Sequence, residues 1–227
     1  MVGLIAAFGG GILSSLLLQD PKRAPIALLE SNSIGIIWTA CWWLVNYLPG
    51  GLVAKLLSLR PCKLAAKACL NILRAGLMAA RVDLAVELFP GVVAAPLLLG
   101  SIAGTGGRFS IDPILAAIGE LPGPHEISVP TFAARSGFVG AAGYWLAVHV
   151  YRALSAAEGK ALIMTAFLAH GALSDLVGHP LDWTYPLARV AHALARVPMP
   201  DALAGAAGRA AASVDSRPTP SESKKDK

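Results

Sequence analysis

Two apolar stretches of this sequence each contain a cluster of glycines: residues 2–18, VGLIAAFGGGILSSLLL, and residues 88–107, LFPGVVAAPLLLGSIAGTGG. Neither stretch contains a charged residue, and each is long enough to enter a bilayer. Because glycine has no Cβ, such a cluster either bends a membrane helix or lets another backbone approach closely. In channels and transporters, breaks at corresponding places in two halves of the chain mark the permeation or binding site. The predicted pore or helix-kink residues are Gly9, Gly10, Gly11, Gly104, Gly106 and Gly107.

The composition predicts an integral membrane protein. Hydrophobic residues make up 55% of the 227 residues and charged residues 15%, and the mean hydropathy is +0.60. A soluble domain carries about a quarter charged residues. The net charge of +5 lies mainly in loops and the tail, which suits topology setting and anionic lipid headgroups better than nucleic acid.

Apolar stretches also predict the topology. About six transmembrane helices are expected, at residues 2–18, 32–54, 61–82, 88–107, 130–151 and 160–178. Pro49-Gly50-Gly51 is expected to end or bend the second of them. If both termini are cytosolic, eleven basic residues lie in cytosolic segments and three in luminal loops. This positive-inside bias indicates that orientation for a channel domain over residues 1–180.

Two further regions follow the last predicted span. Residues 181–198 contain Trp183 and Tyr185, which suit the membrane interface, and then a short amphipathic helix that we expect to lie on the cytosolic leaflet. Residues 199–227 are rich in Ala, Gly, Ser and Pro and are expected to form a disordered basic cytosolic tail. Its end, Lys224-Lys225-Asp226-Lys227, fits the dilysine signal that retrieves membrane proteins to the endoplasmic reticulum.

A stripe of basic residues runs along the third predicted span. Lys67, Arg74 and Arg81 recur every seven residues, so they share one helix face with a drift of only about 20° per step. A charge inside a span costs a few kcal/mol, and such residues usually face a water-filled cavity or an anionic partner. For Arg74, the most central, lining a polar pathway is favoured over a structural ion pair. The predicted pore-lining or lipid-binding residues are Lys67, Asn71, Arg74, Arg108, Arg135 and Asp175.

Alternatives stay open for the other polar residues of the spans. Arg135 either snorkels to the interface or faces the pathway. For His170 and Asp175 a structural hydrogen bond is favoured, although Asp175 is also a candidate to balance Arg74 across the bundle. The sequence shows neither metal-ligand spacing nor a Ser/His/Asp, Cys/His or paired-carboxylate arrangement. We therefore expect neither an enzyme nor a bound metal or cofactor.

Several motifs together resemble the trimeric intracellular cation (TRIC) channel family. Trp42-Trp43-Leu44, Pro49, Lys55 and Pro61-Cys62-Lys63-Leu64 match the family's Trp-Tyr-Leu, Pro, Lys and Pro-Val-Lys-Leu at equal spacing. Gly104-Thr105-Gly106 resembles the Gly-Ser-Gly of a later span, and Pro130-Thr131 resembles the start of the next. The similarity covers roughly residues 5–180 and is strongest over 42–64.

The resemblance implies an all-α membrane fold of inverted three-helix repeats with glycine-kinked helices, plus a final helix. It implies a homotrimer in the bilayer, with one pore in each subunit, and a chain that begins at the family's second span, without the first transmembrane helix. The implied function is a potassium channel of the endoplasmic reticulum or another intracellular membrane, carrying counter-ions during calcium release and uptake. A secondary transporter with inverted repeats and a non-conducting lipid-binding membrane protein are the alternatives.

The sequence departs from the family at several basic positions. Leu70-Asn71-Ile72 stands where animal members have the Lys-Glu-Val that holds an inositol lipid, and only the arginine that follows, Arg74, is retained. Ala103 and Phe132 replace two further lysines, for which Lys67, Arg108 and Arg135 are candidate substitutes. The resemblance therefore supports the pore architecture better than it supports binding of an anionic inositol lipid.

Overall fold

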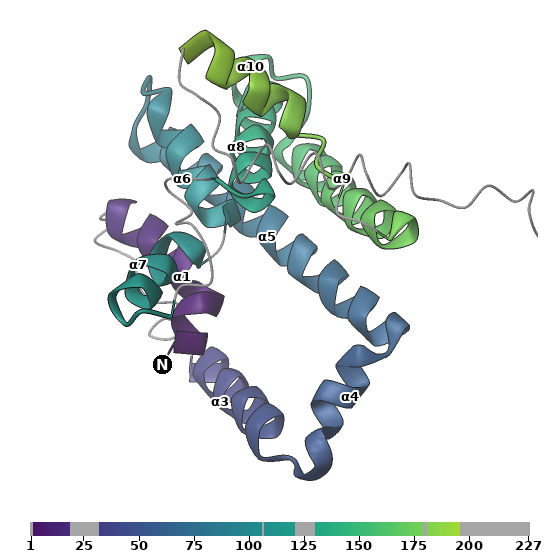
Figure 1. Ribbon diagram of the computed structural model, residues 1–227. Coiled ribbons are helices and arrows are strands. Elements are labelled where there is room, and N and C mark those ends of the chain that lie inside the picture. The colour runs from purple at the N-terminus through teal and green to yellow at the C-terminus, as the bar shows by residue number, and fades with distance from the viewer. Residues whose placement is uncertain (1, 19–31, 106, 121–129, 179–180, 196–227) are drawn as a thin grey trace, which may run out of the picture.

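The computed structural model describes residues 2–18, 32–105, 107–120, 130–178 and 181–195. Within these ranges the chain is built of helices and contains no strand (Figure 1). The predicted all-α class is confirmed. The predicted tail at residues 199–227, its dilysine pattern and Gly106 lie outside the described residues.

The first part of the chain contains one helix and a bent pair. Helix α1 (Val2–Leu18) has the bounds that the sequence predicts. Helix α3 (Asn32–Tyr47) is followed by a 3-10 turn, η1 (Pro49–Gly51), and by α4 (Leu52–Ser58). The chain bends by 91° at this break, because proline lacks a backbone N–H and Gly50 and Gly51 have φ values of +74° and +62°. The predicted bend is confirmed, so the predicted span 32–54 is two helices.

Helix α5 (Arg60–Leu88) is the longest of the described helices, with 29 residues. It begins with Pro61 in its first turn, where a missing N–H costs nothing. Past the predicted end at residue 82, it continues to a turn at Pro90-Gly91, where Gly91 has φ +83°. The predicted fourth span therefore starts at Ala94 rather than Leu88.

The second glycine cluster divides the next segment into two helices. Helix α6 (Ala94–Thr105) and helix α7 (Arg108–Ala117) are separated at residues 106–107. Helix α8 (Phe132–Trp145) continues into a π-helical turn, η2 (Leu146–Val150), and helix α9 (Ala156–Val177) follows. Helix α10 (Tyr185–Ala195) corresponds to the predicted amphipathic segment.

Local signals set the ends of α8 and α9. The Thr131 hydroxyl accepts a hydrogen bond from the Ala133 N–H and caps α8. Ser155 and Glu158 form a capping box at the start of α9, and Gly178, with φ +81°, ends that helix. Helices α8 and α9 thus begin where a side-chain hydroxyl satisfies a free backbone N–H, and α9 ends at a glycine in the left-handed region.

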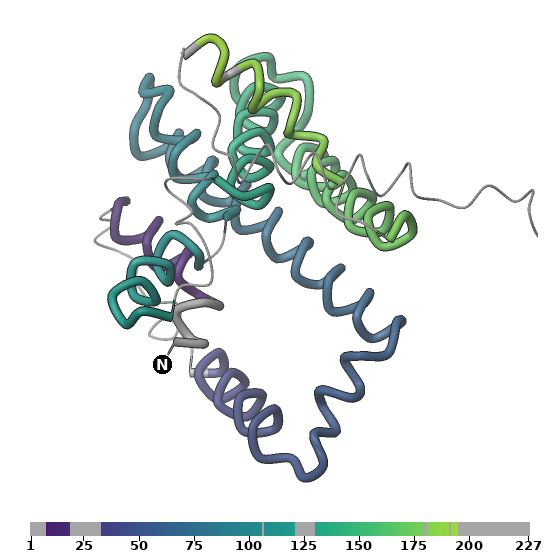
Figure 2. The backbone as a smooth tube through the Cα atoms, viewed as in Figure 1, coloured from purple at the N-terminus to yellow at the C-terminus, as the bar shows by residue number. Residues whose placement is uncertain are grey.

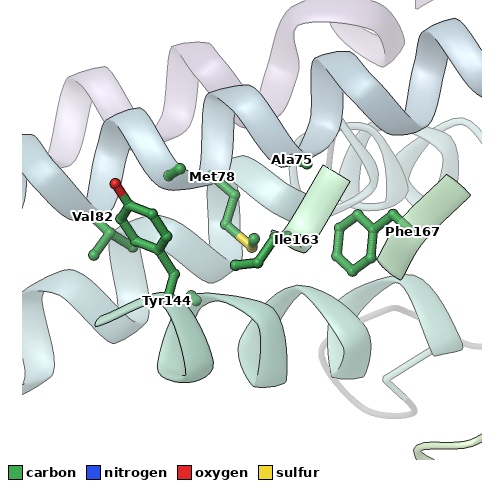
Figure 3. Packing of buried hydrophobic residues seen from close by; sticks show 8 residues of the cluster. Ala75, Met78, Val82, Tyr144, Ile163 and Phe167 are labelled. Atoms are coloured by element: carbon green, nitrogen blue, oxygen red, sulfur yellow. The ribbon is translucent and has the colours of Figure 1, made fainter. Parts of the chain in front are cut away.

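The core lies where α5, α6, α8 and α9 pack together. Its central side chains are shown in Figure 3 and include Met78, Val82, Tyr144 and Phe167. Helices α3 and α4 turn away from this body as a bent arm (Figure 2). Most side chains of the arm are exposed, Trp43 and Ile36 among them.

Few of the helices would span a bilayer unaided. By length and composition, α9 qualifies, and the bent pair of α3 with η1 and α4 is a second candidate. Helix α6 and the segment Phe8–Leu18 of α1 are apolar but shorter. Helix α5 is long enough but carries the basic stripe. The described helices therefore depend on one another to bury polar groups.

Candidate functional site

The two glycine clusters are in direct contact. A Cβ placed on Gly9 of α1 would lie 3.0 Å from both the Cα of Gly107 and the Cβ of Ser110. The Ser110 hydroxyl donates a hydrogen bond to the Gly9 carbonyl at 3.1 Å. Only a residue without a side chain allows α1 to approach the α6–α7 break this closely. The clusters, almost 100 residues apart in sequence, therefore meet at one place in the fold.

The two clusters behave differently. Helix α1 continues through Gly9, Gly10 and Gly11 without a break in its helical hydrogen bonding. Gly9 therefore lets the backbone at Gly107 approach α1 closely, which is the second of the two roles predicted for glycine clusters. The second cluster does break the helix, and Gly107 stands at the N-cap of α7 with φ −77°.

Arg74 reaches this break from the middle of α5. Its Nε donates a hydrogen bond to the carbonyl of Gly104 in the last turn of α6. Its Nη2 donates to the carbonyl of Ala133 and, at 2.8 Å, to the hydroxyl of Ser136, both in α8. The guanidinium carbon also lies 4.7 Å from the ring centroid of Phe167 in α9. One side chain thereby connects four helices.

One acceptor for Arg74, the Gly104 carbonyl, arises from the way α6 ends. The last four carbonyls of a helix have no partner further along it and carry the negative end of the helix dipole. Gly104 lies in this last turn because the glycine cluster interrupts the helix just beyond it. A guanidinium has five N–H donors and a permanent charge, so it suits several such acceptors at once. The break and the intramembrane cation therefore stabilise one another.

Lys67 and Asn71 lie on the same side of α5 and contact α9. The Lys67 ammonium forms an ion pair with Asp175. The Asn71 side-chain amide donates to the carbonyl of Phe167 at 3.2 Å. A Cβ on Gly171 would lie 2.8 Å from that amide nitrogen, so α9 passes close to it. The described contacts of Asp175 are thus with Lys67, and the idea that it balances Arg74 directly gains no support.

The remaining predicted residues lie elsewhere. Arg135 forms an ion pair with Asp182 and donates from Nε to the Thr184 hydroxyl at 3.0 Å, so it faces the segment after α9. Arg108 lies within α7, with Nε 3.5 Å from the buried Asp112 carboxylate. The described partners of Arg135 thus lie in the segment after α9, and that of Arg108 lies within α7. The structure brings together Lys67, Asn71, Arg74, Gly104, Gly107 and Gly9.

His170 has the structural role that the sequence favours. Its Nε2 lies 2.7 Å from the carbonyl of Leu181, and its ring stacks on Phe132 with centroids 4.4 Å apart. Among the described residues, no group of His, Cys, Asp and Glu has the arrangement of a metal site.

The sequence reasoning missed a polar cluster around Asp83. One carboxylate oxygen accepts from the Tyr144 hydroxyl at 2.8 Å and lies 2.9 Å from Nε2 of His149. The other lies 3.0 Å from the Lys160 ammonium. The only signal in the sequence was an acidic residue just beyond the basic stripe. The cluster joins α5, the end of α8 with η2, and α9.

Comparison with known proteins identifies relatives of this chain by sequence. The family model of the TRIC channel matches residues 1–173. The trimeric intracellular cation channel type 1B.2 of Caenorhabditis elegans is 26% identical over 188 residues, which are 82% of this chain and 59% of that protein. The type B channel of Danio rerio is 31% identical over 104 residues, 46% of this chain and 35% of that protein. The chain thus spans less than two thirds of the length of either relative.

Solved structures share the arrangement of the helices. A trimeric intracellular cation channel from C. elegans, solved without Ca²⁺, superposes with a TM-score of 0.61 at 24% identity, covering 75% of this chain and 72% of that one. A second solved structure, from work on TRIC counter-ion channels in calcium release, superposes with a TM-score of 0.61 at 20% identity. The match covers 73% of this chain and 75% of that one. Together with the match over residues 1–173, these findings show that the chain belongs to the TRIC channel family.

Proposed function

We propose that this chain is the subunit of a potassium-conducting monovalent cation channel in the endoplasmic reticulum or another intracellular membrane. Its flux would balance charge during calcium release and uptake. Membership of the TRIC family supports the cation channel. The names of the relatives support an intracellular trimer, and one structural match concerns counter-ion channels in calcium release.

The observation that carries the proposal is the position of Arg74 at the α6–α7 break. Carbonyl oxygens freed by a broken helix are the groups that coordinate cations in membrane proteins. In this structure the Arg74 guanidinium is bonded to the Gly104 carbonyl at that break. The positive charge of the Arg74 guanidinium next to these oxygens repels a permeating cation. We therefore assign this conformation to a closed pathway, which opens when Arg74 moves off Gly104.

The remaining parts of the chain have proposed roles in the same scheme. Residues 1–180 form the channel domain, 181–198 a helix at the bilayer surface, and 199–227 a basic cytosolic tail. An anionic inositol lipid is a further proposed ligand, supported by the exposed Lys63 and the half-exposed side chain of Lys67 at one end of α5. Its support is weaker than that for the pathway, because Lys67 is already paired with Asp175.

Single-channel recording in planar bilayers under a potassium gradient tests the proposal. The purified chain is recorded beside Arg74→Ala and beside Lys55→Gln, which changes an exposed cation on α4 away from the break. We expect discrete steps that reverse near the potassium potential. We expect Arg74→Ala to increase the open probability and Lys55→Gln to leave it unchanged.

Two other outcomes would favour the alternatives. Saturable flux coupled to a second ion gradient, without unitary steps, would identify a secondary transporter. Silent bilayers from folded, verified trimers would identify a non-conducting, lipid-binding membrane protein.

A further inference from the structure

We propose that α10 lies in the surface of the bilayer, with its apolar face in the headgroup–acyl boundary, and that Arg135 clamps it to the first turn of α8. This inference rests on the membrane placement of the fold and is independent of whether the chain conducts.

The apolar face of α10 is exposed in the described structure. Leu187, Val190 and Leu194 are 53%, 56% and 80% exposed. At 100° per residue these three side chains fall within roughly 60° of one another, whereas Arg189 and His192 lie on the opposite side. A helix of a soluble domain turns such a face into the core. Here the face with the largest apolar side chains points away from the body.

The contacts of α10 with the body come from other residues. Thr184, immediately before the helix, is 1% exposed, and Ala188 is 8% exposed. The Thr184 hydroxyl donates to the Asp182 carboxylate at 2.6 Å and accepts from Nε of Arg135 at 3.0 Å. Arg135 also pairs with Asp182. The start of α10 is therefore held firmly, and its apolar face remains free of these contacts.

The anchoring point lies at the depth where two helices end. Arg135 is in the first turn of α8, and Phe132 of the same turn packs edge-to-face against Trp183 with centroids 6.1 Å apart. Helix α9 ends at Val177, just before this segment. Helix α8 begins, and the antiparallel helix α9 ends, at one level. That level therefore corresponds to the membrane–water interface. The half-exposed Trp183 is the residue type that favours that depth.

The position of the charged side chains on α10 indicates that its apolar face contacts the bilayer. An interfacial helix buries its apolar side at the acyl boundary and directs its cations to phosphate groups and water. Arg189 and His192, opposite Leu194, have this placement. The clamp also has a consequence for the site, because Arg135 is in the same helical turn as Ala133 and Ser136, which accept from Arg74. Arg135 is thus a positioning residue between α10 and the pathway.

Nitroxide depth measurements on the full chain test the proposal. The native cysteines are exposed or half-buried, so Cys41, Cys62 and Cys69 are changed to serine, or to alanine if the serine protein is not monodisperse. A label is then attached through Leu194→Cys or through the matched control Arg189→Cys, in vesicles of phosphatidylcholine and phosphatidylserine. Relaxation by oxygen, which concentrates in the bilayer, is compared with relaxation by a water-soluble nickel chelate.

The expected result is that oxygen relaxes the Leu194 label strongly and nickel weakly, with the reverse order at Arg189. Equal access of nickel to both labels would overturn the proposal, because α10 would then lie in water. Exclusion of both reagents from the Leu194 label would also overturn it, because the face would then pack on protein. Arg135→Gln is expected to broaden the range of depths of the Leu194 label, and Arg108→Gln is the control. No step depends on conduction, so this outcome is separate from the channel recordings.

Discussion

Arg74 is stabilised by hydrogen-bond acceptors from two other helices, α6 and α8, and by the Phe167 ring of a third, α9. A lysine at this position would offer one compact ammonium, whereas the planar guanidinium donates in several directions and stacks on Phe167. The sequence alone predicted that a cation in the middle of a span needs a polar surrounding. It did not predict which oxygens provide it, since Gly104 and Ser136 are 30 and 62 residues away.

Gly100 is the residue at which we expect the strongest intolerance of a methyl group. A Cβ there would lie 2.5 Å from Cγ2 of Val82 and 2.8 Å from the Cβ of Ala141. Gly100→Ala should lower stability by about 1–3 kcal/mol, because α5, α6 and α8 must move apart. The control is Gly143→Ala in α8, where nothing lies within 4 Å. Thermal unfolding in detergent should show a lower midpoint for Gly100→Ala and an unchanged or higher one for Gly143→Ala.

Gly9 gives a second test of close approach, in this case between the glycine clusters. Gly9→Ala places a methyl group 3.0 Å from the Gly107 backbone, whereas the Cβ of Gly11→Ala meets nothing within 4 Å. We expect Gly9→Ala to alter the unitary conductance and lower the thermal midpoint, with Gly11→Ala near wild type. Identical recordings from the two variants would show that contact between the clusters is unimportant for the pathway.

At the scale of elements, the Asp83 cluster holds α5 to the end of α8 and the start of α9. It lies beside the π-helical turn η2, which contains His149. His149 reaches the same carboxylate oxygen that accepts from Tyr144.

Removal of the carboxylate should loosen this junction. Asp83→Ala leaves the buried Tyr144 hydroxyl and the Lys160 ammonium without their shared partner. We expect a loss of about 1–3 kcal/mol, at the lower end because the Asp83 and Lys160 side chains are partly exposed. Glu87→Ala, on an exposed position one turn along α5, is the control and should stay within about 0.5 kcal/mol. Urea titration followed by circular dichroism measures both, and an equal loss in the two variants would contradict a special role for the cluster.

In the molecule as a whole, the α3–α4 arm is the part whose apolar side chains no other described helix covers. Within the described residues α3 packs mainly against α4. An apolar groove on α3 is formed by small residues and flanked by larger ones: Gly35, Ile36, Thr39, Ala40, Trp43 and Leu44. Small residues at a membrane helix surface allow another helix to pack closely. We expect a neighbouring copy to cover this groove.

Native mass spectrometry from detergent measures this assembly. Wild type should give a species of three times the 23.4 kDa of one chain. Ala40→Trp fills the groove and should lower the trimer fraction, whereas Ala193→Trp on an exposed position of α10 should not. A purely monomeric wild type would contradict the trimer, and an intact Ala40→Trp trimer would place α3 against lipid.

Features with local causes could be predicted from the amino-acid pattern. Long apolar stretches indicated an all-α membrane protein, and Pro49-Gly50-Gly51 indicated an end or a bend in the second predicted span. Each follows from the chemistry of neighbouring residues: a missing N–H, a missing Cβ or an apolar surface. The stripe of Lys67, Arg74 and Arg81 likewise follows from helical periodicity. Lys67 and Arg74 face α9, whereas Arg81 donates to the Ser15 hydroxyl of α1 at 2.6 Å.

The contacts between residues far apart in the sequence depend on how the helices pack in three dimensions. It paired Lys67 with Asp175 and Arg135 with Asp182, and it placed Gly9 against Gly107. It also showed that α1 stays helical through its glycines, although the same residue type breaks the helix after Thr105. Glycine permits both outcomes at similar local cost, so the packing of the surrounding helices decides between them.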